Sequence, residues 1–261
     1  APARAPRAPQ ARQPCHAVSA AACEAAHALG RGVNLGNVLD APREGDWGLR
    51  LSPQLLSLAA ANFRTVRLPV RWSNHAAPTA DATLDEAFAR RVDLAVDQLL
   101  AQGAWVILDL HHYMQLTGGP LHPHEFAVDE AVAEERLVNL WRQVAQRYRQ
   151  RPPRLLFELF NEPSGTLGGE RWNRLAARTL AAVRESNPTR VVVIGPDEWN
   201  HPRGLARLVL PPDRNLIVGI HSYDPFDFTH QAVPWRRPVL PGGRRCCDAA
   251  QRAQVAQALD Q

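Results

Sequence analysis

Six short apolar runs, separated by stretches with helical spacing, constrain the fold of this 261-residue chain more than any other feature. The runs are nearly continuous in apolar character, which is typical of strands buried on both faces of a parallel sheet. They occupy residues 32–37, 65–70, 105–111, 155–162, 191–196 and 216–223. Repeated strand–helix units of this kind predict a parallel α/β fold.

The stretches between the runs carry ordinary helix signals. Ser52 and Pro53 form a cap followed by proline at the first helical position. Asp248 is expected to cap a last helix over residues 248–261. In three further stretches, apolar side chains recur three or four residues apart, which indicates helices with one core-facing side. These side chains are Phe88, Val92, Val96 and Leu99; Leu137, Trp141, Val144 and Tyr148; and Trp172, Leu175, Leu180 and Val183.

Polar residues at the ends of the runs distinguish an open sheet from a barrel. A nucleotide-binding sheet would show a Gly-rich phosphate loop after its first strand, and residues 32–37 (GVNLGN) lack that pattern. In a barrel of parallel strands, all carboxyl ends open onto one face. Six polar strand ends therefore favour a barrel. They carry Asn34 and Asn37, Arg67 and Arg71, His111 and His112, Asn161 and Glu162, Asp197 and Glu198, and His221 and Tyr223.

The number of units is smaller than in a whole barrel. An eight-unit barrel takes about 250 residues, whereas this chain shows about six strand–helix units. We therefore expect a TIM (β/α)8 barrel of which about six of eight units are present, with two units absent after Gln261. Residues 1–19 are predicted to be a tail or linker rich in Pro, Ala and Arg, and residues 20–261 to be the truncated barrel domain.

Charge and apolar content exclude other classes of protein. All 30 basic residues are arginine, against 26 acidic residues, for a net charge of +4. Arg4, Arg7 and Arg12 lie in the tail, so the rest of the chain is nearly neutral and we expect no nucleic-acid partner. No run of about 18 uninterrupted apolar residues exists, so we expect no membrane span.

The cysteines favour an oxidising compartment. They form two close pairs, Cys15 with Cys23 and Cys246 with Cys247. Cys15 and Cys23 could be bridged only if Cys15 precedes the helix that holds Cys23, because eight residues of helix separate two sulfurs too widely. An even count at close spacing indicates a secreted or periplasmic bacterial protein, with free thiols as the alternative.

Residues 155–163 (LLFELFNEP) carry the strongest chemical signal. A buried strand ends in Asn161 and Glu162, and Pro163 stops it. An ionised Glu beside an apolar strand is costly unless it is paired or used. Two interpretations follow: Glu162 forms a salt bridge with an arginine, or it is a catalytic carboxylate.

Together with four further motifs, this segment resembles glycoside hydrolase family 5, the cellulase-type barrels of the retaining clan A glycosidases. Asn-Glu-Pro after an apolar strand is similar to the acid/base motif of that clan. The other matches fall in the family's order, at residues 32–36 with 46–48, at 66–72, at 109–113 and at 221–223. The resemblance covers roughly residues 30–261.

The resemblance implies an endo-β-1,4-glucanase that hydrolyses O-glycosidic bonds in β-glucans with retention. A β-mannanase or xyloglucanase of the same family stays open, as does a non-catalytic carbohydrate-binding relative that lacks the nucleophile. A metal-dependent α/β hydrolase is a third alternative. The expected partner is a β-glucan polysaccharide or oligosaccharide, and we expect a monomer without a cofactor.

The resemblance also implies roles for single residues. Glu162 would be the acid/base, Asn161 would bond the 2-hydroxyl of the sugar, and Arg67 would hold the nucleophile ionised. His111, His221 and Tyr223 would line the same subsite. The family's nucleophile is a Glu at the end of the seventh strand, and we expect it to be absent from this chain. Glu198 and Asp224 lie on the expected face but do not fit that position.

Side chains near the strand ends are expected to bind sugar, because flat rings stack on pyranose rings. Core packing is the alternative for each ring. The predicted substrate-binding set is Asn34, Trp47, Trp72, His112, Tyr113, Glu198, Trp199 and Trp235, with His201 as a weaker candidate. We expect no catalytic metal, because His111 and His112 are adjacent and would point to opposite faces of a strand.

Overall fold

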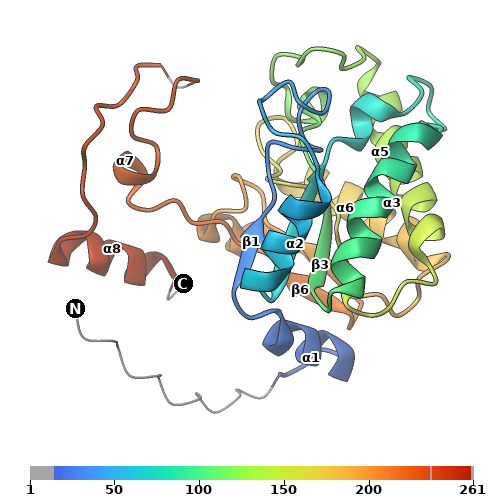
Figure 1. Cartoon of the computed structure of the whole chain (residues 1–261), viewed down its shortest axis with the longest axis horizontal. Helices are drawn as coiled ribbons and strands as arrows, with labels where there is room; N and C mark the ends of the chain where they lie inside the picture. The colour runs from blue at the N-terminus through green and yellow to red at the C-terminus, as the bar shows by residue number, and fades with distance from the viewer. Residues whose placement is uncertain (1–14, 236, 260–261) are drawn as a thin grey trace.

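The computed structural model describes residues 15–235 and 237–259. Its centre is an all-parallel sheet of six strands, in which neighbours follow the order of the chain. A doubly wound sheet would reverse its strand order at a switch point, so these are consecutive strands of a barrel wall (Figure 1). The strands are β1 (Gly32–Asn34), β2 (Thr65–Val70), β3 (Trp105–Leu110), β4 (Leu155–Glu158), β5 (Val192–Ile194) and β6 (Leu216–Val218).

Long helices cover the outer face of this sheet. They are α2 (Pro53–Asn62), α3 (Glu86–Ala101), α5 (Glu130–Tyr148) and α6 (Gly169–Arg184). Ser52 caps α2 as predicted, with its Oγ accepting a hydrogen bond from the Leu55 N–H at 3.1 Å. The apolar stripes predicted for α3, α5 and α6 face the main core, which they share with outward-facing residues of the strands.

Further helical elements lie outside this group of four. They are α4 (Met114–Thr117), α7 (Phe226–Thr229), α8 (Ala249–Leu259) and the 3-10 helices η1 (Trp72–His75) and η2 (Pro202–Arg207). Asp248 caps α8 as predicted, accepting from the Gln251 N–H at 2.8 Å. α7 and α8 lie to one side of the barrel body (Figure 1). Within the described residues, none of the helices is long and apolar enough to cross a membrane.

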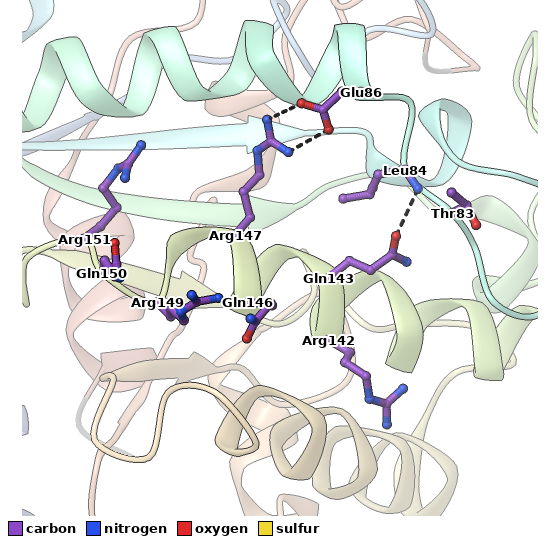
Figure 2. Close-up of a pocket in the computed structure, with 10 residues that line it drawn as sticks. All are labelled: Thr83, Leu84, Glu86, Arg142, Gln143, Gln146, Arg147, Arg149, Gln150 and Arg151. Atoms are coloured by element: carbon purple, nitrogen blue, oxygen red, sulfur yellow. Dashed lines mark hydrogen bonds and ion pairs between the residues drawn. The ribbon is translucent and has the colours of Figure 1, made fainter.

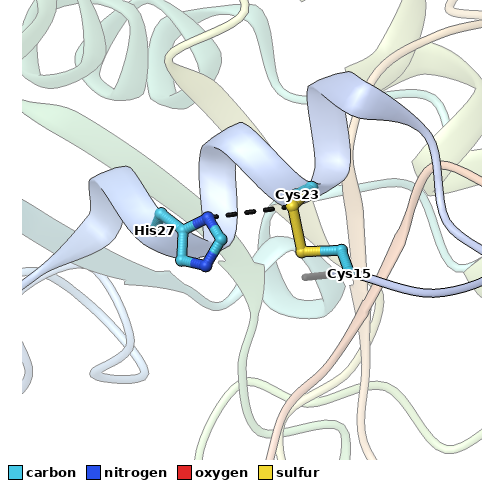
Figure 3. Close-up of side chains that lie close together, drawn as sticks. All are labelled: Cys15, Cys23 and His27. Atoms are coloured by element: carbon cyan, nitrogen blue, oxygen red, sulfur yellow. Dashed lines mark hydrogen bonds between the residues drawn. A yellow bond between two sulfur atoms is a disulfide. The ribbon is translucent and has the colours of Figure 1, made fainter. Parts of the chain in front are cut away.

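Helix α1 (Ala20–Leu29) packs against the amino-terminal half of the sheet. Ala22 and Ala25 contact a second apolar cluster that includes Leu156 and Val193. A disulfide joins Cys23 of α1 to Cys15, which precedes the helix as the spacing required (Figure 3). Cys246 and Cys247 form the other pair. Residues 1–14 of the predicted tail lie outside the described residues.

The two outer strands of the sheet have free edges. Among the described residues, β1 and β6 each pair with a single strand. Val218 and Ile220, at the β6 edge, are exposed. The prediction of about six strand–helix units of a barrel is thus confirmed.

Most strands end earlier than the apolar runs that predicted them. β4, for example, ends at Glu158, although its run continues to Glu162. The chain leaves the ladder at these ends and takes left-handed backbone conformations, with φ of 62° at Asn37, 54° at His112 and 49° at Glu162. The carboxyl ends of the strands are therefore shaped by turns, and these turns determine where the polar side chains point.

Candidate active site

Four successive strands bring polar side chains together around Arg67. Arg67 of β2 donates from Nε and Nη2 to the two carboxylate oxygens of Glu158, both at 2.8 Å. Its Nη1 donates to Asn34 Oδ1 at 2.8 Å, and its Nη2 lies 2.9 Å from Asp109 Oδ2. The register explains this meeting, because Asn34 pairs with Arg67 and Asp109 pairs with Glu158 across the sheet.

This group is buried, and it pairs one guanidinium with two carboxylates. Asp109 and Glu158 are buried carboxylates, and Arg67 is mostly buried between them. Burial alone would lower the pKa of Arg67, but Asp109 and Glu158 outweigh it and raise that pKa above its ordinary value. Arg67 is therefore a permanent cation at the carboxyl end of the sheet.

Arg67 also orients Asn161. Its Nη2 donates to Asn161 Oδ1 at 2.9 Å, while the Asn161 backbone N–H donates to Leu110 O at 2.9 Å. The amide oxygen is thus directed at the guanidinium, which leaves the Nδ2 hydrogens of Asn161 for another acceptor.

Glu162 lies next to this group and is open to solvent. Its left-handed backbone turns the side chain out of the strand direction, and this side chain is 22% exposed. Oε1 lies 2.7 Å from His221 Nδ1 and accepts from the Tyr223 hydroxyl at 3.4 Å. Burial and the nearby Glu162 both raise the pKa of Tyr223, so this hydroxyl keeps its proton and remains a donor.

The loop after β5 holds His221 in place. The His221 N–H donates to Asn200 O at 2.8 Å, and Asn200 Nδ2 lies 3.5 Å from His221 Nε2. Residues 198–200 all have left-handed φ, between 56° and 59°. The Asn200 side chain lies against Gly195, where a Cβ would lie 2.2 Å from Asn200 Oδ1, so only glycine allows this packing.

The two adjacent histidines after β3 lie on the same side, which corrects the expectation that they point to opposite faces. His112 has φ of 54°, and this turn brings its ring centroid to 4.4 Å from that of His111. His111 Nδ1 lies 2.6 Å from Asp109 Oδ2. Burial, the neighbouring His111 and Arg71 lower the pKa of His112 to about 2.

Three of the tryptophans predicted to bind sugar have exposed rings. Trp47 is 39%, Trp199 58% and Trp235 70% exposed. Trp47 stands edge-on to His112 at 5.5 Å, with the Arg71 guanidinium 5.4 Å from its ring centroid. Trp235 contacts His230, whose ring in turn lies 5.1 Å from Tyr223. These rings therefore lie on the face that carries Glu162.

Two other rings of the predicted sugar-binding set are buried in the core. Trp72 is fully buried and packs edge-on against Phe88. Tyr113 is buried too, and its hydroxyl accepts from Arg136 Nη1. Neither ring has surface to offer a ligand, because the turn after each strand directs it into the core.

Glu198, also in the predicted sugar-binding set, has its carboxylate 2.6 Å from Arg207 and 3.4 Å from Arg203. Asp224, which also lies on this face, is 3.5 Å from His201 Nε2. Neither acid contacts the Arg67 group in the described residues.

Sequence reasoning missed two members of the site, Asp109 and Glu158. Both are carboxylates inside apolar runs, at residues 105–111 and 155–162. A charge in an apolar strand is costly unless it is paired or used, which is the reason for selecting Glu162. The same cost is greater for Asp109 and Glu158, because they lie deeper in their strands. They are the arginine-paired carboxylates, whereas Glu162 contacts His221 and Tyr223.

A separate hollow on the outer helices does not belong to this site. It has a volume of about 620 Å³ and lies beside α3 and α5 (Figure 2). Three of its four arginines are paired with carboxylates: Arg142 with Glu185, Arg147 with Glu86 and Asp93, and Arg151 with Asp97. The chemistry of the chain therefore gathers at the carboxyl ends of the strands.

Comparison with known protein families gives an extended match. Residues 44–261 match the family described as Cellulase (glycosyl hydrolase family 5). Among curated proteins, the chain is 37% identical over 215 residues to Endoglucanase H of Acetivibrio thermocellus, covering 80% of this chain and 22% of that protein. It is 26% identical to Cellodextrinase A of Ruminococcus flavefaciens, covering 82% and 64%. The chain thus spans less than two thirds of the length of either relative.

Solved structures show the same similarity in three dimensions. A hyperthermophilic endo-beta-1,4-glucanase in complex with substrate superposes with a TM-score of 0.85 at 34% identity, covering 92% of this chain and 74% of the other. Thermotoga maritima Cel5A in complex with mannotriose gives 0.83 at 34% identity, covering 91% and 75%. The barrel architecture and the order of its units are therefore shared with these structures.

Proposed function

The chain belongs to the cellulase family, glycosyl hydrolase family 5, and from this premise we propose that it forms the active-site part of a retaining endo-β-1,4-glucanase. One observation carries the proposal. Glu162 presents a partly exposed carboxylate at the carboxyl end of β4, with His221 and Tyr223 both directed at the same oxygen. This is the position at which barrel enzymes place catalytic groups.

Glu162 would act as the acid and then as the base. In the first step its proton passes to the glycosidic oxygen as the bond to the leaving sugar breaks. In the second step the same carboxylate takes a proton from the attacking water. His221 and Tyr223 would hold the carboxylate in one rotamer through both steps, so that the proton moves along a fixed direction.

Asn161 would bind the sugar hydroxyl next to the reacting carbon. Because its Oδ1 is held by Arg67, its Nδ2 can donate to a hydroxyl oxygen of the bound sugar. Hydrogen bonds to the 2-hydroxyl strengthen as positive charge develops on the ring. Arg67 thus supports catalysis through Asn161, besides neutralising Asp109 and Glu158.

A retaining mechanism needs a second carboxylate about 5–5.5 Å from the first. The side chains of Asp109 and Glu158 are buried, at 0% and 5% exposure, so they have no access to a bound sugar, and Glu198 is held by Arg207. These contacts support a nucleophile other than the three acids, consistent with the seventh-strand Glu that the family resemblance implies.

The exposed rings of Trp47, Trp199 and Trp235 support an extended sugar-binding face. A β-1,4-glucan is the proposed substrate, because the similar curated proteins include endoglucanases. The likeness to a structure with bound mannotriose favours β-mannan as a second candidate.

Hydrolysis of carboxymethylcellulose, β-mannan and xyloglucan by the natural protein tests this proposal. We expect the highest kcat/KM on the glucan, and we expect Glu162→Gln to reduce kcat by about 10³-fold without loss of folding. Glu185→Gln is the matched control, because Glu185 is an exposed carboxylate paired with Arg142 on the outer helices.

Two results would replace the proposal. Dominant hydrolysis of mannan would make the protein a β-mannanase. Tight binding of cello-oligosaccharides by the natural protein without any hydrolysis would favour the non-catalytic carbohydrate-binding alternative.

We further propose that the protein works in an oxidising compartment, outside the cytoplasm. The Cys15–Cys23 disulfide supports this, since such bonds persist where thiols are not kept reduced. Alkylation of the native protein without reductant should leave Cys15 and Cys23 unmodified by mass spectrometry. Complete alkylation of both would contradict it.

A further inference from the structure

Three side chains beside the Arg67 group form a cluster of metal-ligand type. Asp40 follows β1, and His111 and His112 follow β3. One ligand atom from each lies within 4.8 Å of the other two. Asp40 is buried and the two histidines are half-buried, so the cluster sits in the floor of the carboxyl-end face.

The Asp40 carboxylate is fixed with one oxygen toward the histidines. Its Oδ1 accepts from the Val38 N–H at 2.9 Å, and its backbone carbonyl accepts from Arg71 Nε at 2.8 Å. Its Oδ2 lies 4.0 Å from His112 Nε2. The carboxylate therefore has an oxygen available in the direction of the rings.

His111 has the support that metal-binding histidines generally have. Its Nδ1 is bound to Asp109 Oδ2 at 2.6 Å, which leaves Nε2 for an external ligand. Such a carboxylate partner fixes the ring and increases the basicity of the free nitrogen. His112 supplies the second imidazole, and its Nε2 lies on the side of Asp40 Oδ2.

We propose that Asp40, His111 and His112 bind a Zn²⁺ ion, with water in the fourth position. Two imidazoles and one carboxylate are a set that zinc accepts, whereas Ca²⁺ and Mg²⁺ require mainly oxygen ligands. Ligand atoms around tetrahedral zinc lie about 3.4 Å apart, so the present spacing closes by small side-chain rotations.

Nearby arginines set the strength of binding. Arg67 and Arg71 both oppose a cation at this place, and both act on His112. Arg67 is neutralised by Asp109 and Glu158, and Arg71 lies near Glu125 and Asp40. These four carboxylates outnumber the two guanidinium groups, so a cation can bind here. We expect a micromolar affinity for Zn²⁺.

The effect of the ion on sugar binding rests on the proposed function. The ion would occupy His111 and His112 on the face that is proposed to bind sugar. Zinc and cello-oligosaccharide should therefore exclude one another, and zinc should act as an inhibitor and not as a catalytic ion.

Calorimetric titration with ZnCl₂, together with the visible absorption of added Co²⁺, tests the site at pH 7 without reductant. We expect one zinc per chain, and a loss of about tenfold or more in affinity in His112→Gln and in Asp40→Asn. The second variant should stay folded, because an amide oxygen can still accept from Val38.

Two controls address the other histidines. His124→Gln alters an exposed histidine outside the cluster. His27→Gln alters the other group of possible ligands, Cys15, Cys23 and His27, whose sulfurs are held in the disulfide. Both should bind zinc as the wild type does. No zinc binding by the wild type, or loss of binding in either control with retention in His112→Gln, would overturn the inference.

Titration of cellotriose with and without ZnCl₂ separates the two proposals. We expect zinc to weaken cellotriose binding. Independent binding of both would overturn the placement of the ion in the sugar face. If zinc does not bind but cellotriose does, the metal site is overturned and the proposed function is unaffected. If cellotriose does not bind but zinc does, the result counts against the proposed function and the metal site is unaffected.

Discussion

Two buried arginines at opposite ends of the sheet show how differently the same side chain is used. Arg67, at the carboxyl ends, is bound to Glu158 and Asp109, and its pKa is raised. Arg190, just before β5, has no carboxylate partner among the described residues. It donates to the backbone carbonyls of residues 148, 151, 152 and 155 and to Asn187, and burial lowers its pKa to about 10.

The difference separates a functional from a structural role. Arg190 ties the end of α5 to the start of β4 through neutral acceptors, so it holds the chain path. Arg67 gathers acids whose burial would be unfavourable alone, and it directs Asn161 beside the open carboxylate of Glu162. The candidate active site is therefore distinguished by the charged groups gathered at the carboxyl ends of the strands. A buried arginine alone does not distinguish it, because Arg190 is buried too.

The largest expected effect is at Arg67. Arg67→Met should lower the free energy of unfolding by about 4 kcal/mol, because it leaves two buried carboxylates without a cation. Urea denaturation measures this. Adding Glu158→Gln to that variant should recover about 1 kcal/mol or more through coupling of the two sites. Additive losses in the double variant would show that the two side chains do not act as a pair.

Arg190→Met should cost less, about 2–3 kcal/mol, since hydrogen bonds from a charged donor to neutral carbonyls are lost but no charge is left buried. The same denaturation experiment applies. Binding of cellotriose should be unchanged, because Arg190 lies at the amino-terminal side of the sheet. A large change in cellotriose affinity would contradict the assignment of a purely structural role to Arg190.

The disulfide is a further test of the amino-terminal side. Cys15→Ser with Cys23→Ser should lower the free energy of unfolding by about 2 kcal/mol, since the closed loop is short. The thermal midpoint with and without reductant measures the contribution. Wild type under reductant should match the double variant, and a loss of hydrolysis at equal stability would contradict a purely structural role.

The smallest effect concerns pH at the carboxyl end. Burial lowers the pKa of His75 to about 4, and its Nε2 is buried without a partner among the described residues. The unfolded chain therefore binds more protons between pH 6.5 and 4, and the His75 contribution, intact above pH 6.5, is lost as pH falls. We expect a loss of at most roughly 2 kcal/mol of stability between pH 7 and 5 from this residue.

His75→Phe should reduce that pH dependence, because a phenyl ring can keep the stacking on Phe88. His124→Gln, at an exposed position, is the control and should keep it. Denaturation midpoints at pH 7, 6 and 5 decide the matter. Identical pH profiles for wild type and His75→Phe would show that His75 does not couple folding to protonation.

Much of the fold could be predicted from the sequence, because the spacing of apolar residues and the residues that cap helices are local properties of the chain. β2 spans residues 65–70, as its apolar run did, and Ser52 and Asp248 cap helices at the expected places. The carboxyl ends could not be predicted, because left-handed turns decide them. Those turns place His112 beside His111, while Trp72 and Tyr113 enter the core.

Only part of the candidate site could be predicted, because some of its contacts depend on strand pairing and not on local sequence. Family motifs pointed to Glu162, His221 and Tyr223, and the structure brings these three together. Asp109 and Glu158 form their contacts only across strands. Pairing between strands that are distant in the chain is set by the register of the whole sheet, which no local motif reports.

Chemical rescue of Glu162→Ala tests the central claim most directly. With 2,4-dinitrophenyl β-cellobioside, whose leaving group needs no proton, the variant in the natural protein should still form its glycosyl intermediate. Added azide should then accelerate turnover and yield the β-glycosyl azide, because a small nucleophile does not need the missing base. An unchanged rate with azide, or wild-type hydrolysis of carboxymethylcellulose by the variant, would contradict the assignment of Glu162 as the acid/base.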